Sequence, residues 1–169
     1  NLNSSAVNVT ATDSEVNLNQ GATSSNTNTK ITTGTFANSA VNLNWGASIG
    51  TGTFNTGSIV TLDNGASIGN GTFAASALTL KNNSSITAFT TNPTFSNLTI
   101  DTSDLTLTAA TVTGVTLIKR TPNTANFGTL TLNSSSILQG TTTISTNGIL
   151  NLNLNSSAVN VTATDSEVN

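Results

Sequence analysis

Two adjacent segments decide the fold: VNLNWGASIGTGTFNTGSI at residues 41–59 and VTLDNGASIGNGTFAASA at residues 60–77. Each begins with an alternating apolar and polar tetrad and turns near a Gly. Each then runs through Ala-Ser-Ile to a second Gly-containing corner, followed by Gly-Thr-Phe. Alternation with a period of two is typical of a short strand with one buried face, and Gly and Asn supply the backbone conformations that tight corners need. Each segment is therefore predicted to be one coil of a β-solenoid, with a short strand along each side.

The alternating tetrad recurs along the whole chain. It begins at Val16, Val41, Val60, Leu78, Leu98, Leu130 and Leu150, with a weaker member at Thr116 and a resumption at Val168. The spacings run from 14 to 25 residues and cover 152 residues, which predicts eight coils of about 19 residues each. No segment shows a sustained helical period, so we expect an all-β chain. A sandwich, a barrel or an array of immunoglobulin-like sandwiches is the alternative.

One stretch of the chain occurs twice. Residues 1–17 read NLNSSAVNVTATDSEVN, and residues 153–169 repeat them letter for letter. We interpret residues 1–152 as one full tandem repeat of solenoid coils and residues 153–169 as the start of the next identical repeat. The alternative is a separate subunit that stacks head to tail on its copies, which also generates a filament.

Stacked coils place equivalent apolar side chains above one another. Four Phe residues, each preceded by Thr, are expected at equivalent positions as an internal ladder of rings; the predicted core ladder is Phe36, Phe54, Phe73, Phe95, Leu18, Leu43, Leu62, Leu80, Ile100, Leu132 and Leu152. A carbohydrate-facing role for these rings is the weaker alternative, since Phe suits a wet surface less than Trp or Tyr does. Trp45, the sole Trp, is interpreted as a corner cover over the core rather than as a surface anchor for a ligand.

The composition argues against several classes of function. Thr, Asn and Ser make up 82 of the 169 residues, so the outside of the fold is expected to be polar and nearly uncharged. The four basic residues, Lys30, Lys81, Lys119 and Arg120, are too few to neutralise phosphates, which argues against nucleic-acid binding. No apolar run is long enough to span a membrane.

The residues needed for common catalytic routes are also missing. The chain has no His and no Cys, so it lacks the usual general base and thiol nucleophile. Its carboxylates are Asp13, Glu15, Asp63, Asp101, Asp104, Asp165 and Glu167, and the Asp13–Glu15 pair is interpreted as a solvated corner. We expect no enzymatic activity, no cofactor and no metal site.

Two places depart from the regular spacing. Residues 23–28 are extra in the unit that begins at Val16, and we expect a loop at a corner there. The short unit at Thr116 carries the only basic pair, in residues 119–122, and is expected to form a solvated edge, a bulge or a contact between fibres.

Thr-x-Thr pairs raise the possibility of an ice-binding face. They occur at Thr33/Thr35, Thr51/Thr53, Thr106/Thr108 and Thr111/Thr113. Such a face needs Thr in every coil, and the spacing is read as placing Thr53 against Asn70 in the next coil. We therefore expect the ladder of Thr side chains to break there, which makes ice binding a weak alternative.

The tetrads, together with GASIG and GTF at intervals of about 19 residues, resemble the repeat regions of filamentous haemagglutinin-type adhesins and related giant bacterial surface β-solenoids. The resemblance implies a right-handed parallel β-helix. The identical 152-residue repeat looks more like that of a long fibre or sheath protein. The expected function is a non-enzymatic structural segment of a secreted or cell-surface filament, whose partner is itself, end to end and by lateral packing. The alternative is the stalk of an adhesin whose binding tip lies outside this segment.

Overall fold

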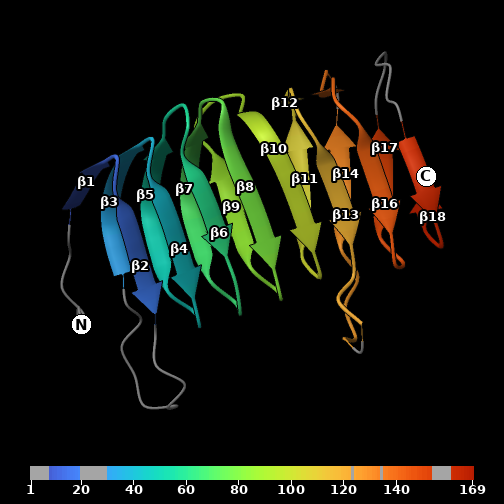
Figure 1. The fold of residues 1–169 in the computed structure, drawn as a ribbon, viewed down its shortest axis with the longest axis horizontal. Helices are drawn as coiled ribbons and strands as arrows, with labels where there is room; N and C mark the ends of the chain where they lie inside the picture. Colours follow the sequence, from blue (N-terminus) through green and yellow to red (C-terminus); the bar gives the residue numbers. More distant parts are fainter. Residues whose placement is uncertain (1–7, 20–29, 123, 134, 154–160) are drawn as a thin grey trace.

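The computed structural model describes residues 8–19, 30–122, 124–133, 135–153 and 161–169. These residues form nineteen β-strands in three sheets and contain no helix. Every pair of neighbouring strands runs parallel. In Figure 1 the strands follow one another along the long axis of the molecule, from the blue N-terminal end to the red C-terminal end.

The first sheet has five strands in the order β1-β3-β5-β7-β9. Their bounds are Asn8–Thr12 for β1, Lys30–Ala37 for β3, Ser48–Phe54 for β5, Ser67–Phe73 for β7 and Ser85–Phe89 for β9. Near the C-terminus, the third sheet has the order β11-β14-β17-β19. Its strands are β11 (Asp104–Thr108), β14 (Thr129–Asn133), β17 (Ile149–Asn153) and β19 (Glu167–Val168).

The second sheet runs along nearly the whole molecule, in the order β18-β16-β13-β10-β8-β6-β4-β2. These strands are β2 (Glu15–Asn19), β4 (Ala40–Asn44), β6 (Ile59–Leu62), β8 (Ser76–Lys81), β10 (Thr94–Asp101), β13 (Thr116–Lys119), β16 (Thr142–Ser145) and β18 (Val161–Thr164). Two short strands, β12 (Thr111–Val112) and β15 (Ile137–Leu138), pair with each other, and β12 also pairs with β10.

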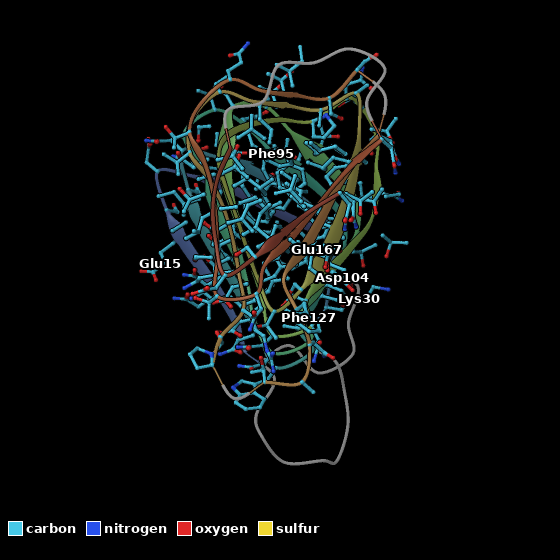
Figure 2. All side chains as sticks on the ribbon, turned by 90° about the vertical axis from the view of Figure 1, so that its right-hand side faces the viewer. Glu15, Lys30, Phe95, Asp104, Phe127 and Glu167 are labelled. Carbon is cyan, nitrogen blue, oxygen red and sulfur yellow. The ribbon has the colours of Figure 1, made fainter. Side chains whose placement is uncertain are left out.

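From β1 to β11 the chain alternates between the second sheet and one of the other two; after that, β12 and β13, and then β15 and β16, follow one another within the second sheet. Each strand pairs with the strand one turn further along, so neighbours in a sheet are never consecutive in sequence. Figure 2 looks along the long axis and shows the sheets enclosing a common interior filled with side chains. This all-β, parallel arrangement is consistent with a β-solenoid.

The two segments that decide the fold stack in register. Val41 lies opposite Val60 and Leu43 opposite Leu62 in the second sheet. In the first sheet Ile49 lies opposite Ile68. All these side chains are buried, so the period-2 alternation read from the sequence corresponds to strands with one face in the core.

Three of the predicted Phe residues form a stack at the ends of strands β3, β5 and β7. The ring centroids of Phe36 and Phe54 are 5.2 Å apart, and those of Phe54 and Phe73 are 4.7 Å apart. Phe95 does not occupy the equivalent position: it lies in β10 of the second sheet, opposite Ser76. Its strand neighbour is therefore different, although its ring reaches that of Phe73 from across the interior, at 5.2 Å between centroids.

Phe89 explains the displacement of Phe95. It lies in the first sheet opposite Gly71, one of the glycines beneath the stack. The chain then turns through residues 90–93 before β10 begins, so the Thr-Phe pair at residues 94–95 falls on the other side of the coil. The Thr-Phe dipeptide that Phe95 shares with the other three Phe residues therefore does not place it at the same position in the coil.

The aliphatic ladder follows a different path from the expected one after Ile100. Leu18, Leu43, Leu62, Leu80 and Ile100 lie in consecutive register in the second sheet. The ladder continues through Ile118 and Ile144. The expected members Leu132 and Leu152 belong instead to the third sheet, where Leu132 lies opposite Leu107 and Leu152 is only partly buried.

The tetrad at Leu130 was therefore assigned to the wrong stack. It pairs with Leu105-Thr-Leu-Thr108, an alternating segment that has the same pattern, and not with the tetrad at Thr116. Strand β13 pairs with β16 instead. The short spacing of 14 residues thus joins strands of two different sheets, whereas the true register steps are mostly 18–20 residues, with longer steps at insertions.

The two identical segments also lie in different sheets. Strand β1 belongs to the first sheet, but its copy β18 belongs to the second. Strand β2 belongs to the second sheet, and its copy β19 to the third. Identical local sequence therefore forms strands in both places but joins different sheets.

Candidate functional site

One edge of the molecule is built from stacked corners with left-handed backbone. Trp45, Asn64, Asn83 and Thr102 have positive φ angles of 54°, 50°, 62° and 56°. Asn tolerates this region better than most residues because its short polar side chain bonds locally. Each corner bonds to the next: for example, the Gly46 amide donates to the Asn64 carbonyl at 3.1 Å. The result is a continuous polar edge.

The segment between β13 and β14, of which residues 120–122 and 124–128 are described, is an insertion that is fixed to this edge through Asp101. Thr121 Oγ1 donates to Asp101 Oδ1 at 2.9 Å, and the Thr121 amide donates to Thr102 Oγ1 at 2.9 Å. Lys119 Nζ lies 3.4 Å from Asp101 Oδ2. Asp101 is only 5% exposed, so this carboxylate is a buried anchor for the start of the insertion.

The far end of the insertion returns toward earlier corners. Asn126 Nδ2 donates to Asn83 Oδ1, which is 43 residues away in sequence. Arg120 donates to the Thr124 carbonyl, and its Cζ lies 5.0 Å from the centroid of the Phe127 ring. The insertion is thereby tied at both ends across two corners.

A groove of about 570 Å³ lies between the insertion and the corners. Its lining includes Asn83, Ser103, Asp104, Asn126 and Phe127. Asp104 and Phe127 are exposed, whereas Ser103 is 3% exposed and its Oγ has no hydrogen-bond partner. Figure 2 shows Asp104 and Phe127 on the same part of the molecule, below the core marked by Phe95.

The side chains that line this groove are mostly uncharged. It contains one carboxylate and no basic side chain, and its other polar groups are hydroxyls and amides. Within the part of the chain that the structure describes, no three His, Cys, Asp or Glu side chains come together to hold a metal ion. The groove thus offers polar atoms and one aromatic face, without a pair of groups for acid–base chemistry.

Several residues that the sequence analysis singled out lie away from this groove. Trp45 is 50% exposed at its corner, so much of its ring faces solvent rather than covering the core. Lys119 and Arg120 contact Asp101 and Phe127 of their own chain. Residues 23–28 lie outside the described residues. Sequence reasoning does not single out Phe127; the available signal is an aromatic residue inside the irregular segment that begins at Arg120.

The columns of Thr side chains are more regular than the sequence spacing suggested. Thr53 lies opposite Thr72, and Thr51 is the residue opposite Asn70. Thr35 lies opposite Thr53, so one outward column of the first sheet is Thr in consecutive strands. The expectation that Thr53 meets Asn70 was therefore wrong, because the alignment must count from the Gly-Thr-Phe end of each strand.

Comparison with protein-family models, with curated proteins and with solved structures gives no match to this chain. Among the described residues, no helix is long and apolar enough to cross a membrane.

Proposed function

We propose that this chain is a non-enzymatic structural segment of a secreted or cell-surface filament, sheath or fibre. The observation that carries the proposal is the parallel pairing of the second sheet, which links strands from β2 to β18 along the long axis. Backbone pairing in that direction resists extension, and the ladder from Leu18 to Ile144 buries apolar side chains along the same line.

Polar ladders outside the core support an axial, self-continuing structure. Asn42 Nδ2 donates to Asn17 Oδ1 at 2.9 Å, and Asn153 Nδ2 donates to Asn133 Oδ1 at 3.0 Å. Such amide ladders run along the axis, as they do in cross-β assemblies. The net charge is only −3, so stacked coils repel one another little.

The finer architecture is part of the proposal. The coils are right-handed, and residues 1–152 form one repeat that is followed by the start of the next. If each return to the second sheet is one turn, β2 and β18 are separated by seven turns, and β1 lies about half a turn before β2. The identical strands β1 and β18 are therefore separated by about seven and a half turns. Successive repeats would then present the same residues on opposite sides of the fibre, instead of in the same orientation as eight full turns would require.

Length measurements on chains of increasing repeat number test this function. Neighbouring coils are separated by about 4.8 Å, so each repeat of about seven and a half turns is expected to add roughly 36 Å of length. Electron microscopy of chains with two, four and eight repeats provides the measurement. A proportional increase at that slope supports the rod, whereas compact or beaded particles contradict it. An adhesin stalk would have the same length and differ by a binding domain elsewhere.

Ice binding is the second candidate, because the register places Thr35, Thr53 and Thr72 in one outward column. Inhibition of ice recrystallisation by the purified chain is the direct assay. If this face binds ice, Thr53→Lys abolishes the inhibition because the long charged side chain disrupts the flat array. Thr79→Lys on the second sheet is the matched control and leaves it intact. Absence of inhibition by the unmodified chain refutes this candidate.

A further inference from the structure

We propose that the groove between the insertion at residues 120–128 and the corners at Asn83 and Ser103 binds an uncharged saccharide. In this arrangement Phe127 packs against the apolar face of a sugar ring, while Ser103 and Asp104 bond to sugar hydroxyls. The proposal goes beyond the structural role, since a rod needs no binding groove.

The first argument is the exposure of Phe127. Its side chain is 43% exposed, while Phe36, Phe54, Phe73 and Phe95 are all buried. Core packing therefore explains those four rings but not this one. The guanidinium of Arg120 lies over the Phe127 ring and holds its orientation. A fixed, exposed aromatic ring in a polar groove is suited to a ligand that has both apolar C–H and hydroxyl groups.

The second argument is the unpartnered hydroxyl of Ser103. Ser103 lines the groove, and its buried Oγ has no hydrogen-bond partner. Such groups are uncommon in folded proteins because they forfeit hydrogen bonds to water. A sugar hydroxyl that enters the groove would supply the missing partner, with the exposed Asp104 carboxylate as a further acceptor.

The groove carries a negative charge. The groove contains Asp104 and no basic side chain. The nearby Arg120 guanidinium is already engaged with the Thr124 carbonyl and the Phe127 ring. A phosphate or an acidic sugar would therefore meet the Asp104 carboxylate in the groove itself, which disfavours anionic ligands. The volume of about 570 Å³ lies within the range typical of small-molecule sites.

The backbone at these corners disfavours an added peptide strand. The Asn83 amide donates to the Thr102 carbonyl and the Thr129 amide donates to the Ser103 carbonyl, both at 2.9 Å. An extended peptide gains affinity by pairing with unoccupied backbone groups at a sheet edge. Since these groups are already paired with one another, side-chain recognition of a compact polyol is the better fit.

The test uses the full chain and uncharged oligosaccharide probes. The probes are hexamers of glucose, mannose, galactose, xylose and N-acetylglucosamine, with oligogalacturonate as an anionic probe. Saturation-transfer NMR identifies the probe that binds, and calorimetry measures its affinity. We expect binding of at least one uncharged hexamer and weaker binding, or none, of the anionic probe.

Variants connect that binding to the groove. Phe127→Ala is expected to weaken binding about tenfold or more, and Phe127→Tyr to retain it because an aromatic face remains. Ser103→Ala is expected to weaken binding several-fold without loss of thermal stability, because it removes a hydroxyl that has no partner. Ile59→Ala is the matched control, since Ile59 is also a large exposed apolar residue, 56% exposed against 43% for Phe127, but does not line the groove.

Three results would overturn the proposal. These are binding of none of the uncharged probes at millimolar concentration, tighter binding of the anionic probe, and unchanged affinity in Phe127→Ala. The length measurement on multi-repeat chains is independent of all three, so the groove and the rod can fail separately.

Discussion

The Gly-Thr-Phe motif makes a sharp prediction about Gly52. A Cβ atom added at Gly52 would lie 2.6 Å from both Cε2 and Cζ of Phe54. The Phe54 ring has no room to move, because it is stacked between Phe36 and Phe73 and is fully buried. The glycine is thus required by the ring that lies over it.

The expected cost follows from this overlap. Adding a methyl group to a well-packed core typically costs about 1–3 kcal/mol. Gly52 has no positive φ, so Ala can adopt its backbone conformation. At such a position Gly→Ala by itself stabilises a protein by about 0.4–1 kcal/mol, by reducing the entropy of the unfolded chain. Whether Gly52→Ala stabilises or destabilises the protein therefore depends on the overlap with the Phe54 ring.

A double-mutant cycle with Phe54→Ala isolates the contribution of the ring. Phe54→Ala is expected to cost about 3–5 kcal/mol, through the lost burial and the cavity that remains. With the ring absent, adding Gly52→Ala should leave the stability unchanged or raise it slightly. In the unmodified chain the same substitution should lower the free energy of unfolding by about 1–3 kcal/mol.

Urea denaturation followed by far-ultraviolet circular dichroism measures all four chains of the cycle. The coupling between the two sites should exceed about 1 kcal/mol, as expected for residues in direct contact. Equal effects of Gly52→Ala with and without the ring would refute the reasoning. The glycine would then be required by backbone conformation or by chance and not by the aromatic stack.

Three further predictions concern corners and charges. Ala75 has a φ of 49°, so Ala75→Gly should raise the free energy of unfolding by about 1 kcal/mol. Ala74→Gly, in contrast, should lower it by about 0.5–1 kcal/mol. Thermal melts of both variants test these two predictions. Asp101→Ala removes the anchor of the insertion and should speed tryptic cleavage after Arg120, while Asp104→Ala, at an exposed carboxylate, should not. Because charges contribute so little, raising the salt from about 0.05 to 1 M, which shortens the screening length several-fold, should change the urea midpoint only slightly; a large decrease would contradict this account.

Local structure was largely readable from the sequence. The alternating tetrads and the Gly and Asn corners indicated short strands with one buried face, and the structure has parallel strands at all the tetrads. These signals are local, because alternation reports which side chains face the core and corner residues report where the backbone turns. The Gly-Thr-Phe motif likewise predicted the three stacked rings, which lie in the neighbouring strands β3, β5 and β7 of the first sheet.

Which sheet each strand joins was decided by the tertiary structure. The tetrad at Leu130 has the expected pattern, yet it stacks on Leu105 and not on Thr116. Alternation requires a partner but does not specify one, since any strand with a similar apolar face at the correct spacing can serve. The groove was equally hidden, because it depends on the contact between Asn83 and Asn126 across 43 residues.

The duplicated segment shows this division most directly. The sequence alone determined that residues 153–169 repeat residues 1–17, and the structure forms strands in both copies, at Asn8–Thr12 and at Val161–Thr164. Yet β1 joins the first sheet, where Ala11 lies opposite Phe36 of the next strand, whereas β18 joins the second sheet, where Ala163 lies opposite Ile144 of the previous strand. The same letters have the same strand propensity and the same alternation. Which sheet each copy joins was decided by how the intervening coils stack, which is a long-range property that no local sequence encodes.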